Sequence, residues 1–170
     1  MKQVKTLFIA IALILGVSSF SNAQSKLAHI ASQELVNSMP EYKNAMNELE
    51  RLQKNYDTEI KTMMAELQSK AKRYDAEQAT KTQEENAKRV QEVQSTERTI
   101  AEYRNNALKD LQKKEVELLK PVIEKARLAV QKVARVKGYE YVIDSTTGTG
   151  LILADGYDLM ADVKKDLGIQ

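Results

Sequence analysis

A run of 97 residues without glycine, from Glu41 to Lys137, most constrains what this chain can fold into. It contains one proline, Pro121, and is rich in Ala, Glu, Lys, Gln, Leu and Arg, which are strong helix formers. Residues 138–170 hold five of the six glycines. The sequence therefore predicts a long helical insertion, residues 41–137, inside a small body made of residues 24–40 and 138–170.

Apolar side chains recur every three or four residues along this insertion, which is the spacing of one face of a helix. The outgoing stripe consists of Tyr42, Ala45, Leu49, Leu52, Tyr56, Ile60, Met63, Leu67, Ala71 and Tyr74. The return stripe consists of Val90, Val93, Ile100, Tyr103, Ala107, Leu111, Leu118, Val122, Ala126, Ala129, Val133 and Val136. The two stripes predict the seam of an antiparallel helical hairpin, here called the arm, with its reversal near residues 80–86. Because the seam is narrow and interrupted, we expect a marginal hairpin that is most flexible at its tip.

The body is expected to combine short strands and helices from both ends of the chain. Residues 26–30 read as a strand, and Ser32 would cap a short helix that runs to Asn37. Pro40 suits the first turn of the outgoing helix, and Gly138 would end the return helix. The C-terminal part predicts strands at residues 139–143 and 151–153, followed by a helix, residues 159–167, capped by Asp158 and stopped by Gly168. The fold class is thus α+β, mainly α.

Fifty residues bury too little apolar surface for a secure core, and beyond residue 23 the chain has neither Trp nor Phe. Isolated strands would also leave open edges. We therefore expect several copies of the chain to share one core. The apolar side chains expected in this oligomer body are Leu27, Ile30, Val142, Ile143, Leu151, Ile152 and Leu153.

The first 23 residues have the pattern of a secretory signal. Lys2 and Lys5 precede an apolar run, residues 7–15, and small residues lead to Ala23. We expect cleavage after Ala23, with an uncleaved anchor as the alternative. The signal carries both charges of the formal net charge of +2, so the remaining chain is neutral.

Several classes of function are disfavoured by composition. The chain has no Cys and one His, His29, for which a structural role is favoured over metal binding. No phosphate-binding GxxxxGK[ST] loop and no paired nucleophile and base are present, so we expect no enzyme activity, cofactor or metal. A neutral, exported chain also argues against nucleic-acid binding.

Local phrases along the chain resemble the Skp/OmpH family of periplasmic chaperones. They are HIASQEL (residues 29–35), MPEY (39–42), VARVKGY (133–139), VID (142–144) and LILAD (151–155), with Pro121, Ile123 and Ala129 between them. The resemblance implies a homotrimer with a shared β-structured body. Its three helical arms would enclose a cavity that holds unfolded outer membrane proteins in the periplasm without ATP.

A chaperone of this kind needs adaptable apolar contacts, which Met and Tyr side chains provide. The candidates for client contact are Tyr42, Met46, Met64, Tyr74 and Tyr103. Met46 and Met64 lie one position off the seam, whereas the tyrosines also fit a purely structural role in it. The main alternative function is a secreted coiled-coil scaffold of the cell envelope, without clients.

Two further features near the arm base invite a role. Pro121 interrupts the return helix and is either a hinge or a fixed bend.

Residues 41–137 have a net charge of +4, and the rest of the mature chain has a net charge of −4. Most of the positive excess lies in a basic band at residues 120–137, in which Glu124 is the one acidic residue. The band would attract anionic lipid weakly, or would simply balance the acidic body; it consists of Lys120, Lys125, Arg127, Lys132, Arg135 and Lys137.

Overall fold

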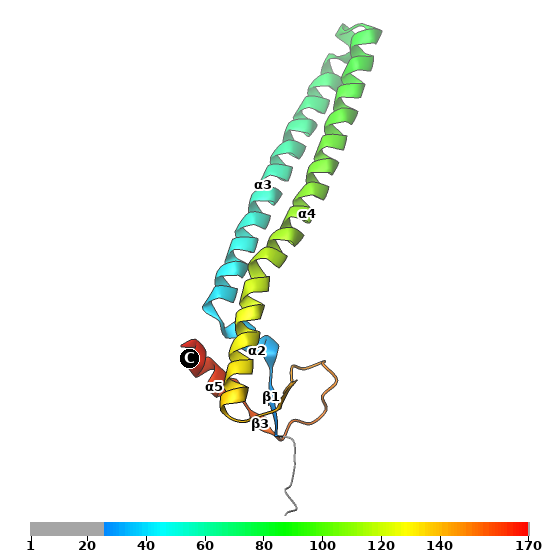
Figure 1. Cartoon of the computed structure of the whole chain (residues 1–170). Helices are drawn as coiled ribbons and strands as arrows, with labels where there is room; N and C mark the ends of the chain where they lie inside the picture. Colours follow the sequence, from blue (N-terminus) through cyan, green and yellow to red (C-terminus); the bar gives the residue numbers. More distant parts are fainter. Residues whose placement is uncertain (1–25, 170) are drawn as a thin grey trace, which may run out of the picture.

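The computed structural model describes residues 26–169 and has a long helical hairpin standing on a small body (Figure 1). The elements are β1 (Leu27–Ile30), α2 (Ser32–Ser38), α3 (Pro40–Glu77), the 3-10 turn η1 (Gln78–Thr80), α4 (Gln83–Val136), β2 (Tyr141–Asp144), β3 (Tyr157–Asp158) and α5 (Met160–Leu167). The α+β, mainly α class is confirmed. The expected signal, residues 1–23, lies outside the described residues.

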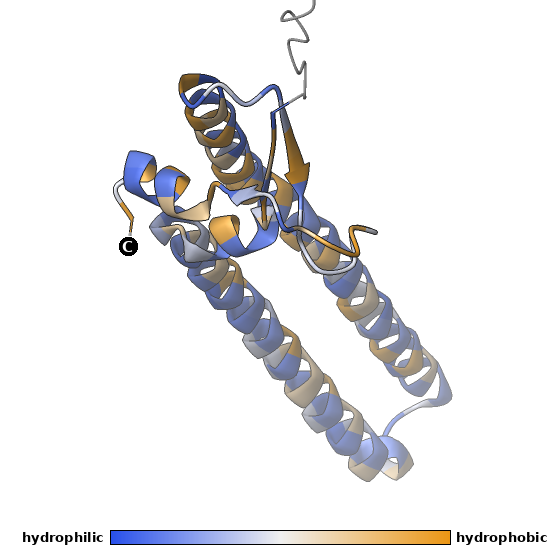
Figure 2. Ribbon diagram, turned by 90° about the horizontal axis from the view of Figure 1, so that it is seen from below, coloured by the Kyte–Doolittle hydropathy of each residue, from blue (hydrophilic) through white to orange (hydrophobic). Residues whose placement is uncertain are grey.

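Helices α3 and α4 run antiparallel and form the arm (Figures 1 and 2). They have 38 and 54 residues, which correspond to about 57 and about 81 Å at 1.5 Å per residue. Pro40 occupies the first turn of α3, where its missing N–H costs no hydrogen bond. Apolar and polar positions alternate along both helices, as the stripes predicted (Figure 2).

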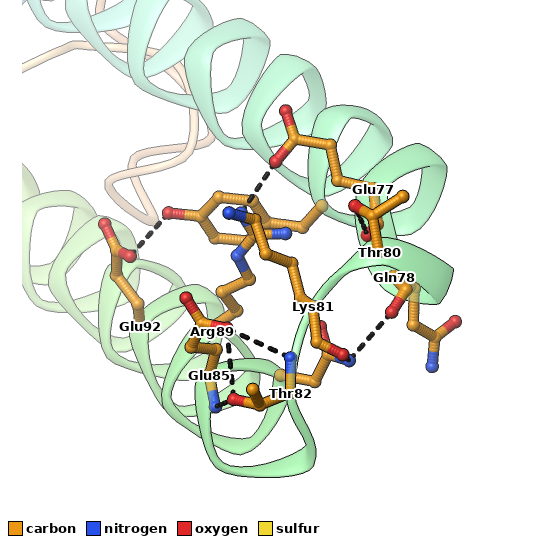
Figure 3. Close-up of polar contacts among 10 residues, drawn as sticks. Glu77, Gln78, Thr80, Lys81, Thr82, Glu85, Arg89 and Glu92 are labelled. Carbon is orange, nitrogen blue, oxygen red and sulfur yellow. Dashed lines mark hydrogen bonds and ion pairs between the residues drawn. The ribbon is translucent and has the colours of Figure 1, made fainter.

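The chain reverses at residues 78–82, slightly earlier than the predicted 80–86. Thr82 caps α4 through a capping box: its hydroxyl accepts the Glu85 N–H at 3.2 Å, and the Glu85 carboxylate accepts the Thr82 N–H at 3.0 Å (Figure 3). The pattern Thr-Gln-Glu-Glu could have located this helix start. Although the turn lacks Gly and Pro, the capping box defines it.

Cross-helix contacts also fasten the arm tip. The Arg89 guanidinium pairs with Glu77 on α3 at 2.6 Å (Figure 3). The same guanidinium lies over the Tyr74 ring, 4.6 Å from its centroid. The Asn86 side-chain amide donates to the Gln78 carbonyl at 3.0 Å. The tip therefore combines ionic, aromatic and backbone contacts within two turns of the reversal.

The body contains a three-stranded parallel sheet in the order β2-β1-β3. The N-terminal strand β1 is central, with Ala28 opposite both Val142 of β2 and Tyr157 of β3. The strand predicted at residues 139–143 corresponds to β2. The strand predicted at residues 151–153 is wrong for the single chain, because this segment pairs with no strand within the described residues and β3 follows it instead.

The core lies where the sheet, α2 and α5 meet the lower part of α4. Its fully buried side chains are Leu35, Met39, Leu159 and Val163. Helix α4 adds buried residues from Val122 to Ala134, all within the segment expected to be arm. The return helix therefore enlarges the body core beyond the fifty residues assigned to the body from sequence.

Candidate functional site

Nearly every residue of the two predicted stripes is buried or half-buried, and those from Val122 to Val133 belong to the body core rather than to the arm interior. Ile100 and Ala107 are buried, and Leu49, Tyr56, Met63, Leu67, Val93 and Leu111 are half-buried. Val90 and Val136 are the exceptions. Val90 is 56% exposed, because the neighbouring Arg89 takes the inward position over Tyr74. Its assignment to the seam is therefore corrected.

Tyrosine–carboxylate hydrogen bonds cross the arm at three levels. Tyr56 donates to Asp110 at 2.7 Å, Tyr103 donates to Glu59, and Tyr74 donates to Glu92 at 2.6 Å. The bond to Glu59 raises the pKa of Tyr103 to about 12.

Lys70 and Tyr74 both donate to Glu92 from α3, and these bonds lower the pKa of that carboxyl. Polar pairs thus hold the two helices together where large apolar residues are scarce.

Three of the five client-contact candidates, which remain a prediction, also have contacts within the chain. The Tyr74 and Tyr103 hydroxyls are engaged across the arm, and the Tyr103 ring packs edge-on against Tyr56 at 6.0 Å. Tyr42 is half-buried against the body core. Met46 and Met64 have more exposed side chains, although the Arg104 guanidinium on α4 contacts the Met64 Sδ atom at 2.6 Å.

Met64 lies in a shallow apolar groove on one side of the arm, here called the arm groove, with a volume of about 480 Å³. Met64 is 48% exposed and Leu108 on α4 is 60% exposed. The groove is lined by Gln53, Tyr56, Asp57, Ile60, Lys61, Met64, Arg104, Ala107, Leu108 and Leu111. Leu108 falls just outside the return stripe, so the spacing of apolar residues does not mark it. Met46 does not line this groove.

A larger hollow of about 870 Å³, the body cleft, lies between α4, α2 and β2. Its apolar wall includes Ile30, Tyr42, Leu119, Ile123 and Val142. Positions 104, 108 and 111 of the arm groove and 115, 119 and 123 of the body cleft follow one another at helical spacing. The two hollows therefore share one side of α4.

The residues expected in the oligomer body fall into two groups. Ile30 is buried and Val142 half-buried on the face that α4 covers. Leu27, Tyr141 and Ile143 lie on the opposite face and are exposed, because successive residues of a strand point to opposite sides. The described chain thus leaves one face of its sheet uncovered.

The loop between β2 and β3, residues 145–156, is here called the apolar loop. It extends sideways from the body (orange in Figure 1). Leu151 is 38% exposed, Leu153 is 70% exposed and Ile152 is fully exposed. Such a row of apolar side chains in water indicates a segment made for contact with another molecule.

Both ends of the apolar loop are tied to the strand–helix corner at residues 29–33. At its start, Asp144 accepts bonds from the Ser32 N–H at 3.1 Å, the Ser32 hydroxyl and the Thr146 N–H at 2.9 Å. At its end, His29 lies 3.2 Å from the Gly156 carbonyl oxygen through Nε2 and 3.1 Å from the Ser145 hydroxyl through Nδ1.

These bonds correct the predicted cap of α2. The Ser32 hydroxyl does not accept from the first turn; the Asp144 carboxylate caps the helix from β2 instead. Partial burial raises the pKa of Asp144, but the bonds from Ser32 and Thr146 outweigh this effect and lower it to about 2. At neutral pH the cap therefore carries a full negative charge at the N-terminus of α2.

Acidic partners occupy much of the basic band. Lys125 pairs with Glu41, Arg127 with Glu124 at 2.6 Å, Lys132 with Asp166 at 2.5 Å, and Lys137 with Asp162 at 2.9 Å. Lys120 and Arg135 have no ion-pair partner among residues 26–169. The band is thus largely neutralised within the chain.

Pro121 is exposed and lies within the continuous helix α4.

Within residues 26–169, no cluster of His, Cys, Asp and Glu side chains has the make-up of a metal site. No helix in the same range has the length and apolar character needed to cross a bilayer.

Comparison with known proteins assigns the family. The model of the family described as outer membrane protein (OmpH-like) matches residues 26–167. The fold is similar to the crystal structure of an OmpH-like protein from Caulobacter crescentus CB15, with a TM-score of 0.76, 18% identity and 86% of each chain covered. The curated proteins contain no significant match. Because the family model spans most of the chain, this protein belongs to the OmpH-like family.

Proposed function

We propose that this protein is an ATP-independent holdase chaperone of the periplasm, which binds unfolded outer membrane proteins between its arms and prevents their aggregation. Membership of the OmpH-like family supports the chaperone role. The similar protein from Caulobacter crescentus is itself described as a candidate outer membrane chaperone. The signal expected in residues 1–23 supports export from the cytoplasm.

The observation that carries this proposal is the arm groove. Met64 and Leu108 project from opposite helices over a floor that includes Ile60 and Leu111. A flexible thioether and a shallow apolar surface accept many side chains without requiring one sequence. Weak contacts of this kind, repeated on several arms, would retain an unfolded chain through avidity.

The functional unit in this proposal is a homotrimer that shares the body, residues 24–40 and 138–170, with three arms, residues 41–137, around a cavity. The exposed side chains of Leu27, Tyr141 and Ile143 support association, since they leave one sheet face without cover in the single chain. A continuous side of α4 joins the arm groove to the body cleft, so the groove would face the space between arms. No lipid partner is required.

Native mass spectrometry of residues 24–170 tests this function. The protein would be measured alone and after rapid dilution of an urea-unfolded outer membrane β-barrel protein. We expect a mass of three chains that gains one unfolded client and ignores a folded soluble control. A stable oligomer that never gains client would instead support the envelope scaffold.

Substitutions in the arm groove test its role directly. The double variant Met64→Lys/Leu108→Lys should raise the client dissociation constant at least about tenfold, because two apolar contacts are replaced by charge. Val116→Lys is the matched control, since Val116 on α4 is similarly exposed but lies outside both hollows. Equal client capture by the double variant and the control would show that the arm groove does not contribute to client binding.

A further inference from the structure

We propose that Met64 is a reversible oxidation site: a peroxide converts its thioether to a sulfoxide, which Arg104 then binds across the arm, and the arm groove loses affinity for clients. The effect on clients rests on the proposed function. The chemistry at the sulfur and the bond to Arg104 do not depend on it.

Met64 is the methionine best placed for such a modification. The chain has no cysteine, so the thioethers of its methionines are its only oxidisable sulfur atoms. In the described part of the chain, Met39 is buried and Met63 and Met160 are half-buried, whereas Met46 is 42% exposed and Met64 is 48% exposed. Met64 lines the arm groove and Met46 does not. Oxidation at Met64 therefore combines access from solvent with a surface that the oxidation would alter.

The oxidant in this proposal is hydrogen peroxide. A lone pair of the Met64 Sδ atom attacks one peroxide oxygen, the O–O bond breaks, and the other oxygen leaves as hydroxide. The oxygen now bound to sulfur gives its proton to that hydroxide, so the products are the sulfoxide and water. The sulfur is oxidised by two electrons and the peroxide is reduced by two.

Arg104 is positioned to bind the new oxygen. Its Nη2 atom on α4 lies 2.6 Å from the Met64 Sδ atom on α3. A thioether is a weak acceptor, whereas a sulfoxide is polar, and a guanidinium offers five N–H donors. Arg104 has no ion-pair partner among the described residues, so its charge is available. Oxidation would thus create a charge-assisted hydrogen bond between the two helices.

The same change removes an apolar contact from the arm groove. Met64 and Leu108 stand over a floor that includes Ile60 and Leu111. A sulfoxide held by Arg104 places a polar group there, and it loses the freedom with which a thioether adapts to different side chains. The oxidised arm would bind clients more weakly, and reduction of the sulfoxide would restore binding.

The arm itself should remain folded after this oxidation. Met63, the neighbour of Met64, occupies the half-buried seam position. The hydroxyls of Tyr56 and Tyr103 bond carboxylates across the arm and do not involve the sulfur. Oxidation of Met64 therefore changes the surface of the groove and leaves these cross-links in place.

Thermal unfolding tests the bond to Arg104 without any client. The protein used is residues 24–170 with Met46→Leu, in which Met64 is the one exposed methionine of the described chain. Treatment with hydrogen peroxide should add one oxygen to Met64, located by peptide mass spectrometry. The change in melting temperature on oxidation should be more favourable by about 2 °C or more than in Met46→Leu/Arg104→Leu. An equal change in both proteins, or a Met64 that stays unmodified, would overturn the inference.

Client capture tests the effect on function. On oxidation of Met46→Leu, the dissociation constant for a urea-unfolded outer membrane β-barrel protein should rise at least about fivefold. Treatment with a methionine sulfoxide reductase should restore it. The matched control, Met46→Leu/Met64→Leu, keeps an apolar groove and should not respond to peroxide.

The two experiments separate the possible failures. If the reduced protein captures client and oxidation leaves that capture unchanged, the inference is overturned and the proposed function stands. If the reduced protein captures no client, the proposed function fails, and the unfolding experiment still decides whether Arg104 binds the oxidised side chain.

Discussion

Asp144 shows how one side chain can organise the body. Its carboxylate accepts the N–H groups of Ser32, in the first turn of α2, and of Thr146, at the start of the apolar loop. Because Asp144 itself ends β2, this one side chain links a strand, a helix and a loop. The sequence marked this residue only as the end of a strand, since a cap that comes from 112 residues away leaves no local pattern. Ser32, in contrast, has the local pattern of a cap and donates its hydroxyl to Asp144 instead.

Replacing Asp144 with Asn should lower the melting temperature at pH 7, because Asn keeps the acceptor but loses the charge. The folded pKa of about 2 lies below the ordinary value of 3.8, so the carboxylate stabilises the fold above about pH 4 and loses this effect as the pH falls towards 2. Thermal unfolding monitored by circular dichroism at pH 2–7 should show wild type and variant converging at acidic pH. A gap that stays constant across this range would contradict the role of the charge.

Helical spacing alone gives limited information about the client-contact candidates. Helical spacing separates the seam from the rest of the surface, so it identified Met64 as lying off the seam. It cannot tell whether a tyrosine near the seam reaches water or a carboxylate on the opposite helix, as Tyr74 and Tyr103 do. Helical spacing does not identify Leu108, because the position of a groove depends on how the two helices are rotated relative to each other.

At the level of elements, the arm is a hairpin with polar cross-links. From base to tip, contacts between α3 and α4 include Lys125 with Glu41, Tyr56 with Asp110, and Arg89 with Glu77. The spacing of apolar residues predicted both helices and their pairing. The polar contacts that fix their register depend on long-range partners, which a single sequence does not reveal.

A double-mutant cycle on Tyr56→Phe and Asp110→Asn measures one of these cross-links. The hydrogen bond joins the two helices of the arm, so we expect a favourable coupling free energy between these residues. Urea unfolding of the four proteins gives this value. Additive effects of the two substitutions would show that the bond contributes nothing to arm stability.

Pro121 supplies a second prediction for the arm. Alanine would restore the backbone N–H that can bond the Glu117 carbonyl one turn earlier. If Pro121 is a hinge, Pro121→Ala should narrow the spread of arm positions seen by solution X-ray scattering. An unchanged spread would make it a fixed feature of the arm base.

At the level of the whole molecule, charge is balanced between arm and body. Two pairs of the basic band, Lys132 with Asp166 and Lys137 with Asp162, link the end of α4 and the residue after it to the two aspartates of α5. This arrangement favours the balancing role of the band over lipid attraction. The sequence predicted the unequal charges of the two parts, whereas the pairing required the fold.

Vesicle sedimentation tests this balance. Wild-type protein should bind vesicles of anionic lipid weakly at about 20 mM salt and negligibly at about 150 mM, since exposed charges are screened. The variant Glu124→Gln/Asp166→Asn, which frees two cations, should bind more at low salt. Strong binding of the wild-type protein to the vesicles at the higher salt concentration would instead support a role of the basic band in lipid binding.

The central position of β1 has a consequence for how the chain is made. Both partners of this strand lie near the other end of the sequence, with Leu27 opposite Tyr141. During synthesis from the N-terminus, β1 must wait for the entire helical hairpin to be completed before it can pair. The arm can close first through neighbouring residues, and its closure brings the two distant ends together. The hairpin that is proposed to bind clients would thus first hold the two ends of its own chain together.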